Sequence, residues 1–239
     1  MPALTRSTFL AAVVTAAFAA AGASVGADEP TTRSAETAER IERWEPDIAK
    51  FEAADDEQMP EAGGVVFVGS STIRGWDLPR FLPEVASINR GFGGSQMRDI
   101  PPFAHRIISK YQPSTVVVYS GDNDLNAGES PDDILSELDR VVREVRGDLP
   151  DVKFVILSIK PSPAREALLG QMIEMNDRFE QYAEGHQGVS YVDIETPVLD
   201  ADGRPRGDLF IGDGLHLNDA GYALITEAIR PHLPASGSN

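Results

Sequence analysis

One short stretch constrains the fold of this 239-residue chain more than any other. Residues 65–68 read Val-Val-Phe-Val and are followed directly by Gly69, Ser70 and Ser71. A short, wholly apolar run rich in valine is typical of a strand that is buried on both faces of a parallel sheet. Open α/β sheets bind their ligands at the carboxyl ends of such strands. Because Gly69 permits a sharp turn at that end, Ser71 is the candidate nucleophile.

Strands and helices alternate along the chain from this stretch onward. The expected strands are residues 65–68, 85–88, 115–119, 153–159 and 189–194, and the expected helices that follow are 97–110, 131–146, 164–184 and 218–232. Repeated units of this kind favour a parallel sheet with helices on both faces. Right-handed crossovers leave few doubly wound arrangements. In the strand order 2-1-3-4-5, the loops after the first three strands would meet around Ser71.

The first 27 residues are expected to be a signal peptide, not a part of the fold. Arg6 precedes an apolar stretch over residues 9–21, and small residues follow as far as Ala27. This layout is typical of a secretory signal, and the apolar stretch is shorter than the roughly 20 residues of a bilayer-spanning helix. We expect export to the periplasm or the cell exterior, with no stable membrane insertion after cleavage. An uncleaved membrane anchor is the alternative.

The rest of the chain is expected to contain a leader with one helix (residues 28–60) and a single domain (residues 61–235). No linker rich in Pro, Gly or Ser divides that domain. A helix is expected over residues 34–57, with one apolar face made by Ile41, Trp44, Ile48 and Phe51. Pro46 is expected to kink this helix or to split it in two.

Charge and composition argue against several classes of protein. The chain carries 38 acidic and 21 basic side chains, for a net charge of −17. A nucleic-acid binder would need a basic face for phosphates, so no nucleic-acid partner is expected, and anionic membranes are disfavoured. The chain has no cysteine, which excludes disulfides, thiolate zinc sites and a lipoprotein anchor.

A glycine-rich loop follows the second predicted strand. It contains Gly91, Gly93 and Gly94, where the backbone can turn tightly or approach another group closely. Such a loop could be a plain structural turn, or it could aim a backbone N–H at an oxyanion. Phosphate binding is a further alternative, although the spacing does not match G-x-G-x-x-G.

A polar loop follows the third predicted strand and reads Ser-Gly-Asp-Asn-Asp-Leu-Asn over residues 120–126. Turn chemistry alone explains such a composition, and a cation site made by Asp122 and Asp124 is conceivable, although calcium loops need more ligands. In a catalytic interpretation, the side chain of Asn123 donates a hydrogen bond to the oxyanion.

Among the four histidines, His216 has an acid placed to partner it. Asp213 lies three residues earlier, with Gly214 to let the chain curl. A carboxylate bonded to Nδ1 would fix the tautomer of the imidazole and leave Nε2 free to take a proton from a serine. Alone, this pattern fits a helix cap or a polar surface as well. Together with Ser71 and the two loops, it indicates nucleophilic catalysis.

These segments resemble the four motif blocks of the SGNH/GDSL hydrolases, in the family's order and over residues 65–233. The matching segments are Gly69-Ser70-Ser71, the glycine loop ending at Gly94, Gly121-Asp122-Asn123-Asp124 and Asp213-Gly214-Leu215-His216. The resemblance implies a flavodoxin-like, three-layer α/β/α sandwich with a mainly parallel five-stranded sheet. It also implies ester hydrolysis without a metal or a cofactor.

The same resemblance assigns roles to individual residues. Ser71 would be the nucleophile, His216 its base and Asp213 the residue that orients the base. The oxyanion hole would consist of the backbone N–H groups of Ser71 and Gly94 and the side chain of Asn123. The sequence departs from the family at Ser70, where an acid usually precedes the nucleophile. Because that residue is outside the triad, the departure concerns loop geometry, not chemistry.

A proline-containing segment, residues 158–165, follows the fourth predicted strand and resembles a segment of bacterial exported members of the family. Lys160 and Arg165 in it could line the substrate pocket, or the segment could be a rigid loop before a helix.

The expected function is that of a serine esterase or acylhydrolase, acting through an acyl-enzyme on short-chain or O-acetyl esters of small molecules or carbohydrates. A non-catalytic carbohydrate- or polymer-binding module on the same fold is the main alternative. A calcium- or nucleotide-binding domain is a third, and the oligomeric state is left open.

Overall fold

The computed structural model describes residues 29–234, with side chains from residue 35 onward. The predicted signal peptide lies outside the described residues. The chain divides into two units, residues 1–37 and residues 38–239. Of the first unit, only the start of helix α1 (Glu29–Glu57) is described, and the second unit holds all other elements. Within the described residues, no helix combines the length and the apolar character of a membrane span.

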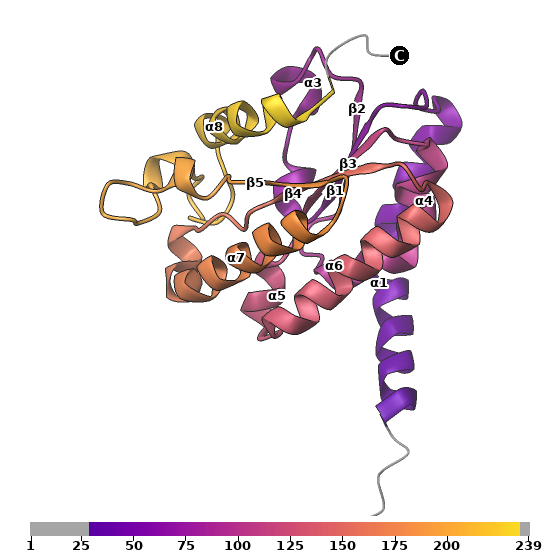
Figure 1. Ribbon diagram of the computed structural model, residues 1–239, viewed down its shortest axis with the longest axis horizontal. Coiled ribbons are helices and arrows are strands. Elements are labelled where there is room, and N and C mark those ends of the chain that lie inside the picture. Colours follow the sequence, from indigo (N-terminus) through magenta and orange to yellow (C-terminus); the bar gives the residue numbers. More distant parts are fainter. Residues whose placement is uncertain (1–28, 235–239) are drawn as a thin grey trace, which may run out of the picture. The chain divides into compact units, whose positions relative to one another are not determined.

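A five-stranded sheet forms the centre of the second unit within the described part of the chain (Figure 1). Its strands are β1 (Val65–Gly69), β2 (Ser87–Gly91), β3 (Thr115–Tyr119), β4 (Lys153–Leu157) and β5 (Val189–Val192). Their order is β2-β1-β3-β4-β5 and every neighbouring pair is parallel. The predicted fold class is therefore confirmed, and β1 lies between β2 and β3.

Two layers of helices cover the sheet, one on each face (Figure 1). The α-helices after α1 are α2 (Ser71–Arg74), α3 (Leu78–Phe81), α4 (Ala104–Ile107), α5 (Asp122–Ala127), α6 (Pro131–Asp148), α7 (Leu169–Gly185) and α8 (Asp219–Ile229). Apolar side chains of α1, α4, α6 and α7 pack on one face of the sheet. Those of α2, α3 and α8 pack on the other.

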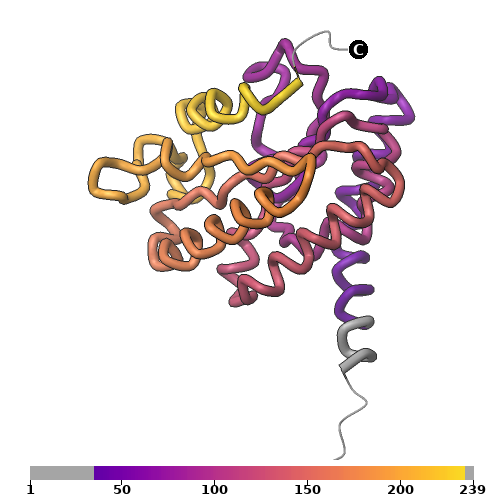
Figure 2. The backbone as a smooth tube through the Cα atoms, viewed as in Figure 1, coloured from indigo at the N-terminus to yellow at the C-terminus, as the bar shows by residue number. Residues whose placement is uncertain are grey.

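The second layer joins segments that are far apart in the sequence. The C-terminal helix α8 and the segment of α2 and α3 lie on the same side of the sheet in Figure 2. Two buried hydrogen bonds connect them: Trp76 Nε1 donates to Thr226 Oγ1 at 3.1 Å, and the Tyr222 hydroxyl donates to the Thr72 carbonyl at 3.0 Å. These bonds fix the short helix α2, which begins at Ser71, against the end of the chain.

Three strands differ from the prediction by two residues or more, and hydrogen bonds explain each difference. β2 lies two to three residues later than expected because the register pairs Val65 with Ser87 and Gly69 with Gly91, which draws polar residues into the strand. β4 and β5 end two residues early. Beyond those ends, side chains accept the backbone hydrogen bonds that a neighbouring strand would otherwise accept. Ile159 N–H donates to the Asn176 side chain, and Ile194 N–H donates to the Ser158 hydroxyl.

The helix predicted over residues 97–110 is wrong. The chain forms four short turns there instead: η1 (Met97–Asp99), η2 (Pro101–Phe103), α4 and η3 (Ser109–Tyr111). Two consecutive prolines, Pro101 and Pro102, remove the backbone donors that a continuous helix needs. Likewise, the helix predicted over residues 164–184 begins as a separate turn, η4 (Pro163–Leu168), before α7.

Helix α1 runs through Pro46 as one continuous helix, so the second form of the prediction, a helix split in two, is wrong. Trp44 and Ile48, on either side of the proline, are both buried against the sheet. Ile41 and Phe51 pack at the edge of the same cluster, which confirms the predicted apolar face. Tertiary packing on both sides of Pro46 therefore outweighs its low helix propensity.

The burial of Ile48 predicts a large stability loss for Ile48→Ala. The side chain is fully buried, and removal of such a group costs about 2–5 kcal/mol in the free energy of unfolding. The matched control is Ile173→Ala on α7, where the isoleucine is 45% exposed and a change within about 0.5 kcal/mol is expected. Urea denaturation measures both. Equal losses would contradict the packing of α1 on the sheet.

Candidate active site

A strained turn at the end of β1 carries Ser71. Gly69 has φ +143°, and a Cβ at this position would lie 1.8 Å from the Tyr119 carbonyl oxygen. Only glycine fits so close to another backbone. The next residue also contacts this carbonyl, because Ser70 N–H donates a hydrogen bond to it at 3.1 Å. Ser70 is buried and its Oγ has no hydrogen-bond partner among the described residues. Ser71 then begins α2 at the carboxyl edge of the sheet.

The structure brings Ser71, His216 and Asp213 together in one chain of hydrogen bonds. His216 Nε2 lies 3.0 Å from Ser71 Oγ, and His216 Nδ1 lies 2.6 Å from Asp213 Oδ2. The loop that carries the last two residues curls at Gly214, whose φ is +65°. Its ends are held by pairing between Phe210 and Leu217. The geometry is that of a nucleophile, a base and a residue that orients the base.

Hydrogen bonds to Asp213 fix the tautomer of the histidine. The imidazole of His216, and after it the backbone N–H groups of His216 and Leu215, hold the pKa of Asp213 well below its usual range. The two backbone groups donate to Asp213 Oδ1 at 3.0 Å and 2.8 Å. An ionised carboxylate only accepts hydrogen bonds, so Nδ1 of a neutral His216 carries the proton. Nε2 is then the acceptor for the Ser71 hydroxyl.

Asn123 lies on the neighbouring loop, at the start of α5 and directly after β3. Gly121, with φ +122°, turns the chain out of the strand. The Asn123 side chain bridges two other loops: Nδ2 donates to the Ser95 carbonyl at 2.9 Å, and Oδ1 accepts from Arg165 Nη2 at 2.9 Å. An amide nitrogen has two hydrogens, so one N–H of this partly exposed side chain remains for a further acceptor.

The glycine loop after β2 packs directly on α2. A Cβ at Gly91 would lie 2.3 Å from the backbone nitrogen of Arg74, and one at Gly93 would overlap the Arg74 guanidinium. Gly94 adopts φ +88°, a conformation that L side chains rarely take. Close approach to the backbone of α2 therefore accounts for Gly91, and backbone conformation accounts for Gly94, whereas the contact at Gly93 is with the flexible end of a side chain. Gly94 directly precedes Ser95, whose carbonyl accepts a hydrogen bond from Asn123.

The two acids of the polar loop have partners inside the protein. Asp122 pairs with Arg165, with 3.0 Å between Oδ2 and Nη1. Asp124 accepts the Met97 N–H at 2.8 Å and the Ser120 hydroxyl at 3.5 Å. Among the described residues, no group of three or more His, Asp or Glu side chains is arranged to hold a metal ion. Burial raises the pKa of Asp124 to about 7.

Lys160 lies inside the protein, beneath the histidine loop. It is 1% exposed, its Nζ donates to the Leu215 carbonyl at 3.0 Å, and it lies 5.5 Å from the centre of the Phe210 ring. Burial lowers the pKa of this ammonium. In this position Lys160 supports the loop that carries His216. The sequence pointed to Lys160 because it follows β4 and therefore lies at the same edge of the sheet as Ser71.

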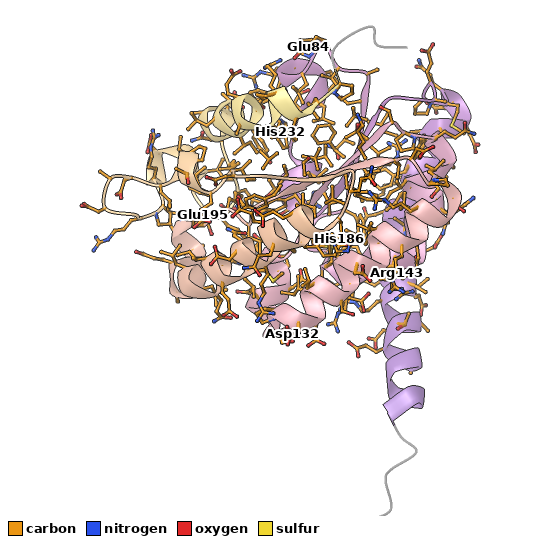
Figure 3. The ribbon with its side chains drawn as sticks, viewed as in Figure 1. Glu84, Asp132, Arg143, His186, Glu195 and His232 are labelled. Atoms are coloured by element: carbon orange, nitrogen blue, oxygen red, sulfur yellow. The ribbon has the colours of Figure 1, made fainter. Side chains whose placement is uncertain are left out.

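Two of the other histidines, His186 and His232, belong to elements that do not carry the site. His186 stacks on Tyr182 with 3.9 Å between ring centres, and its Nδ1 lies 2.7 Å from the Tyr182 carbonyl oxygen. His232 lies in the turn after α8. Figure 3 places these two histidines on opposite sides of the sheet. Among the described residues, His216 is the histidine with a ring nitrogen within hydrogen-bond distance of Ser71 Oγ.

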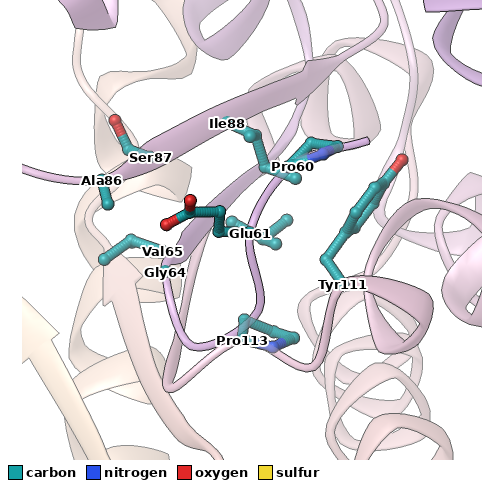
Figure 4. A pocket seen from close by; sticks show the side chains of 10 residues that line it. Pro60, Glu61, Gly64, Val65, Ala86, Ser87, Ile88, Tyr111 and Pro113 are labelled. Carbon is teal, nitrogen blue, oxygen red and sulfur yellow. The ribbon is translucent and has the colours of Figure 1, made fainter. Parts of the chain in front are cut away.

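A cavity of about 220 Å³ lies at the opposite edge of the sheet from Ser71. It is bordered by the amino ends of β1 and β2, and its lining includes Glu61, Ala86 and Tyr111 (Figure 4). Ser71 follows the carboxyl end of β1. The cavity is thus separated from the catalytic candidates by the length of the strands and is not a part of their site.

The sequence is similar to that of a known protein family. The sequence model of the GDSL-like lipase/acylhydrolase family matches residues 67–224, which is more than half of the chain. The match includes Ser71, Gly94, Asn123, Asp213 and His216. Among curated proteins, no sequence matches.

Solved structures share the fold at low sequence identity. A Streptococcus pneumonia protein, provisionally described as a platelet activating factor, is 19% identical, with a TM-score of 0.73 over 86% of this chain and 100% of its own. A GDSL-like lipase from Bacteroides thetaiotaomicron is 18% identical, with a TM-score of 0.68 over 77% and 96%. A carbohydrate esterase of family 3 from Talaromyces cellulolyticus is 20% identical, with a TM-score of 0.59 over 71% and 95%. At these identities the likeness shows the fold alone.

The pKa of Asp124 predicts how the protein's stability depends on pH. Its folded pKa of about 7 lies above the value of about 3.9 for an exposed aspartate. Between these values the folded protein holds a proton that the unfolded chain has lost, so this group's contribution to stability falls as pH rises from about 4 to 7. Asp124→Asn keeps an oxygen that can accept the Met97 N–H, but its amide does not gain or lose a proton in this pH range.

Chemical denaturation from pH 4 to 8 tests this. The free energy of unfolding of Asp124→Asn, relative to that of the wild type, should rise up to about pH 7 and then level. Asp132→Asn, at a side chain that is 86% exposed, is the control and should show no such rise. A constant difference between Asp124→Asn and the wild type would contradict the prediction.

Proposed function

The chain belongs to the GDSL-like lipase/acylhydrolase family, and from this premise we propose that it is a serine esterase acting through an acyl-enzyme on Ser71. One observation carries the proposal: the continuous hydrogen-bonded path from Asp213 through His216 to Ser71, with steps of 2.6 Å and 3.0 Å. An isolated serine is a weak nucleophile, and this path supplies the base that activates it.

In the proposed reaction, His216 Nε2 takes the proton of Ser71 as Oγ attacks the ester carbonyl carbon. The tetrahedral intermediate collapses when Nε2 gives that proton to the leaving alkoxide, and the acyl group remains on Oγ. Water then loses a proton to Nε2 and attacks the acyl carbon, which releases the acid and returns the proton to Ser71. Asp213 holds the imidazole and stabilises its charged form in both steps.

The oxyanion would be stabilised by three donors from the three adjacent loops. Ser71 is the first residue of α2, where backbone N–H groups have no acceptor within the helix. Gly94 contributes a second backbone N–H, and Asn123 contributes the N–H that is not bonded to Ser95. Donors held in place before the reaction stabilise the charge that develops on the carbonyl oxygen without a cost of reorganisation.

The proposed substrates are short-chain or O-acetyl esters of small molecules or carbohydrates. The family's activity on acyl esters supports this class, and one structural neighbour is a carbohydrate esterase. Export through residues 1–27 is part of the proposal, because an exported esterase would meet acylated carbohydrates. Residues 61–235 are proposed as the hydrolase domain.

Loss of the Ser71 hydroxyl should abolish activity. Hydrolysis of p-nitrophenyl esters from acetate to octanoate is measured with the full chain, and Ser71→Ala should lower kcat by roughly 10⁴–10⁶-fold. The matched control is Ser70→Ala, which removes the neighbouring buried hydroxyl that has no partner and should leave most of the activity. A fluorophosphonate probe should label the wild type and Ser70→Ala but not Ser71→Ala. A folded wild type that neither hydrolyses these esters nor reacts with the probe would contradict the proposal.

Asn123→Ala should lower kcat by roughly 10²–10³-fold, the usual effect of removing one oxyanion donor. KM should change little, because the donor acts mainly in the transition state. Steady-state kinetics on p-nitrophenyl acetate measures both constants. A near-normal kcat would remove Asn123 from the oxyanion hole while leaving the triad in place.

A further inference from the structure

Arg165 contacts the candidate oxyanion donor directly. Its Nη2 donates to Asn123 Oδ1 at 2.9 Å, and its Nη1 lies 3.0 Å from Asp122 Oδ2. The arginine side chain is only 12% exposed and that of Asp122 is 6% exposed. A guanidinium buried to this extent is held in one place, so it can determine the orientation of the groups it touches.

The contacts around Asn123 allow only one orientation of its amide. Arg165 has no acceptor atom, so Asn123 must present Oδ1 to it, and the Ser95 carbonyl has no donor, so Asn123 must present Nδ2 there. A flipped amide would place Oδ1 against a carbonyl and Nδ2 against a cation. The two partners thus direct the second N–H of Nδ2 to one fixed side.

The charge of Arg165 also acts on the strength of that donor. A guanidinium that donates to the amide oxygen draws electron density toward Oδ1 and makes the N–H groups of the same amide better donors. The ion pair with Asp122 compensates the buried charge, so the arginine remains close to the site at a lower desolvation cost.

The segment that carries Arg165 is connected to the histidine loop as well. Arg165 departs from helical geometry within η4 (φ −124°, ψ 24°) and precedes the regular helix α7. The preceding residue, Ala164, donates its N–H to the Gly214 carbonyl at 3.0 Å. The η4 segment therefore contacts the Asp122–Asn123 loop through a side chain and the Asp213–His216 loop through its backbone.

We propose that Arg165 is a positioning residue of the oxyanion hole, which orients and polarises the Asn123 amide and does not bind the substrate itself. The inference rests on the proposed function. It replaces the expectation that Arg165 lines the substrate pocket, because its guanidinium faces Asn123 and Asp122.

A double-mutant cycle tests this role. In the wild-type background, Arg165→Gln should lower kcat at least roughly tenfold and by no more than Asn123→Ala does, with KM nearly unchanged, because only a transition-state donor is affected. In the Asn123→Ala background, the same substitution should change kcat by less than about twofold, since the group it positions is gone. Arg165→Lys, which keeps the charge but cannot hold both partners as a planar fork, should restore part of the loss.

Arg106→Gln is the control, since Arg106 is a partly buried arginine that bonds two acids, Glu45 and Glu52, at 2.6–2.8 Å and does not contact Asn123. It should leave kcat unchanged, and thermal melting verifies that each variant is folded. If Arg165→Gln does not fold, the cycle is run with Arg165→Lys.

Two outcomes would overturn the inference. One is a rise in KM at constant kcat, which would mean direct substrate contact. The other is an undiminished loss of kcat for the Arg165 variant in the Asn123→Ala background. Failure of the proposed function is distinguishable, because it would appear as a folded wild type without ester hydrolysis or probe labelling, or as full activity in Ser71→Ala.

Discussion

The close approach of Gly69 to the Tyr119 carbonyl is the contact on which the arrangement of the site depends. It is possible because β1 pairs in parallel with both β2 and β3, so that Gly69 lies beside Gly91 and Tyr119 in register. Parallel pairing brings the ends of all three strands to one edge. The loops that carry Ser71, Gly94 and Asn123 therefore begin side by side at this edge of the sheet, although the three residues are far apart in the sequence.

Buried ion pairs and hydrogen bonds hold these loops once the strands have placed them. Arg40 of α1 donates twice to Asp99 at 2.6 Å, and Asp99 accepts the Gln96 N–H at 2.8 Å. On the other side, Arg165 joins Asp122 and Asn123. Two of the three loops of the proposed oxyanion hole, the glycine loop and the loop of Asp122 and Asn123, are thus each held by an arginine from another element. Removal of one partner of such a pair leaves an uncompensated buried charge, which is strongly destabilising.

Helix α1 belongs to this supporting structure. Besides the bond from Arg40, the ring of Trp44 lies 3.7 Å from the position of a Cβ on Gly94. Farther along the helix, Asp55 accepts from Arg90 of β2 and from the Tyr111 hydroxyl. The part of α1 from Arg40 to Asp55 therefore packs behind the glycine loop and β2. It therefore supports the loop of Gly94, which belongs to the proposed oxyanion hole.

The sequence by itself determined the fold class, the strand order and the candidates for the triad. Valine-rich runs are recognisable because burial on both faces excludes polar residues, and Gly69, Gly94 and Gly214 mark turns that other residues rarely adopt. Local sequence could not determine the positions of Lys160 and Arg165. Both follow β4 and both are basic, yet one supports the histidine loop and the other orients Asn123. Which partner each basic group meets depends on contacts between residues more than forty positions apart, and only the tertiary structure decides those contacts.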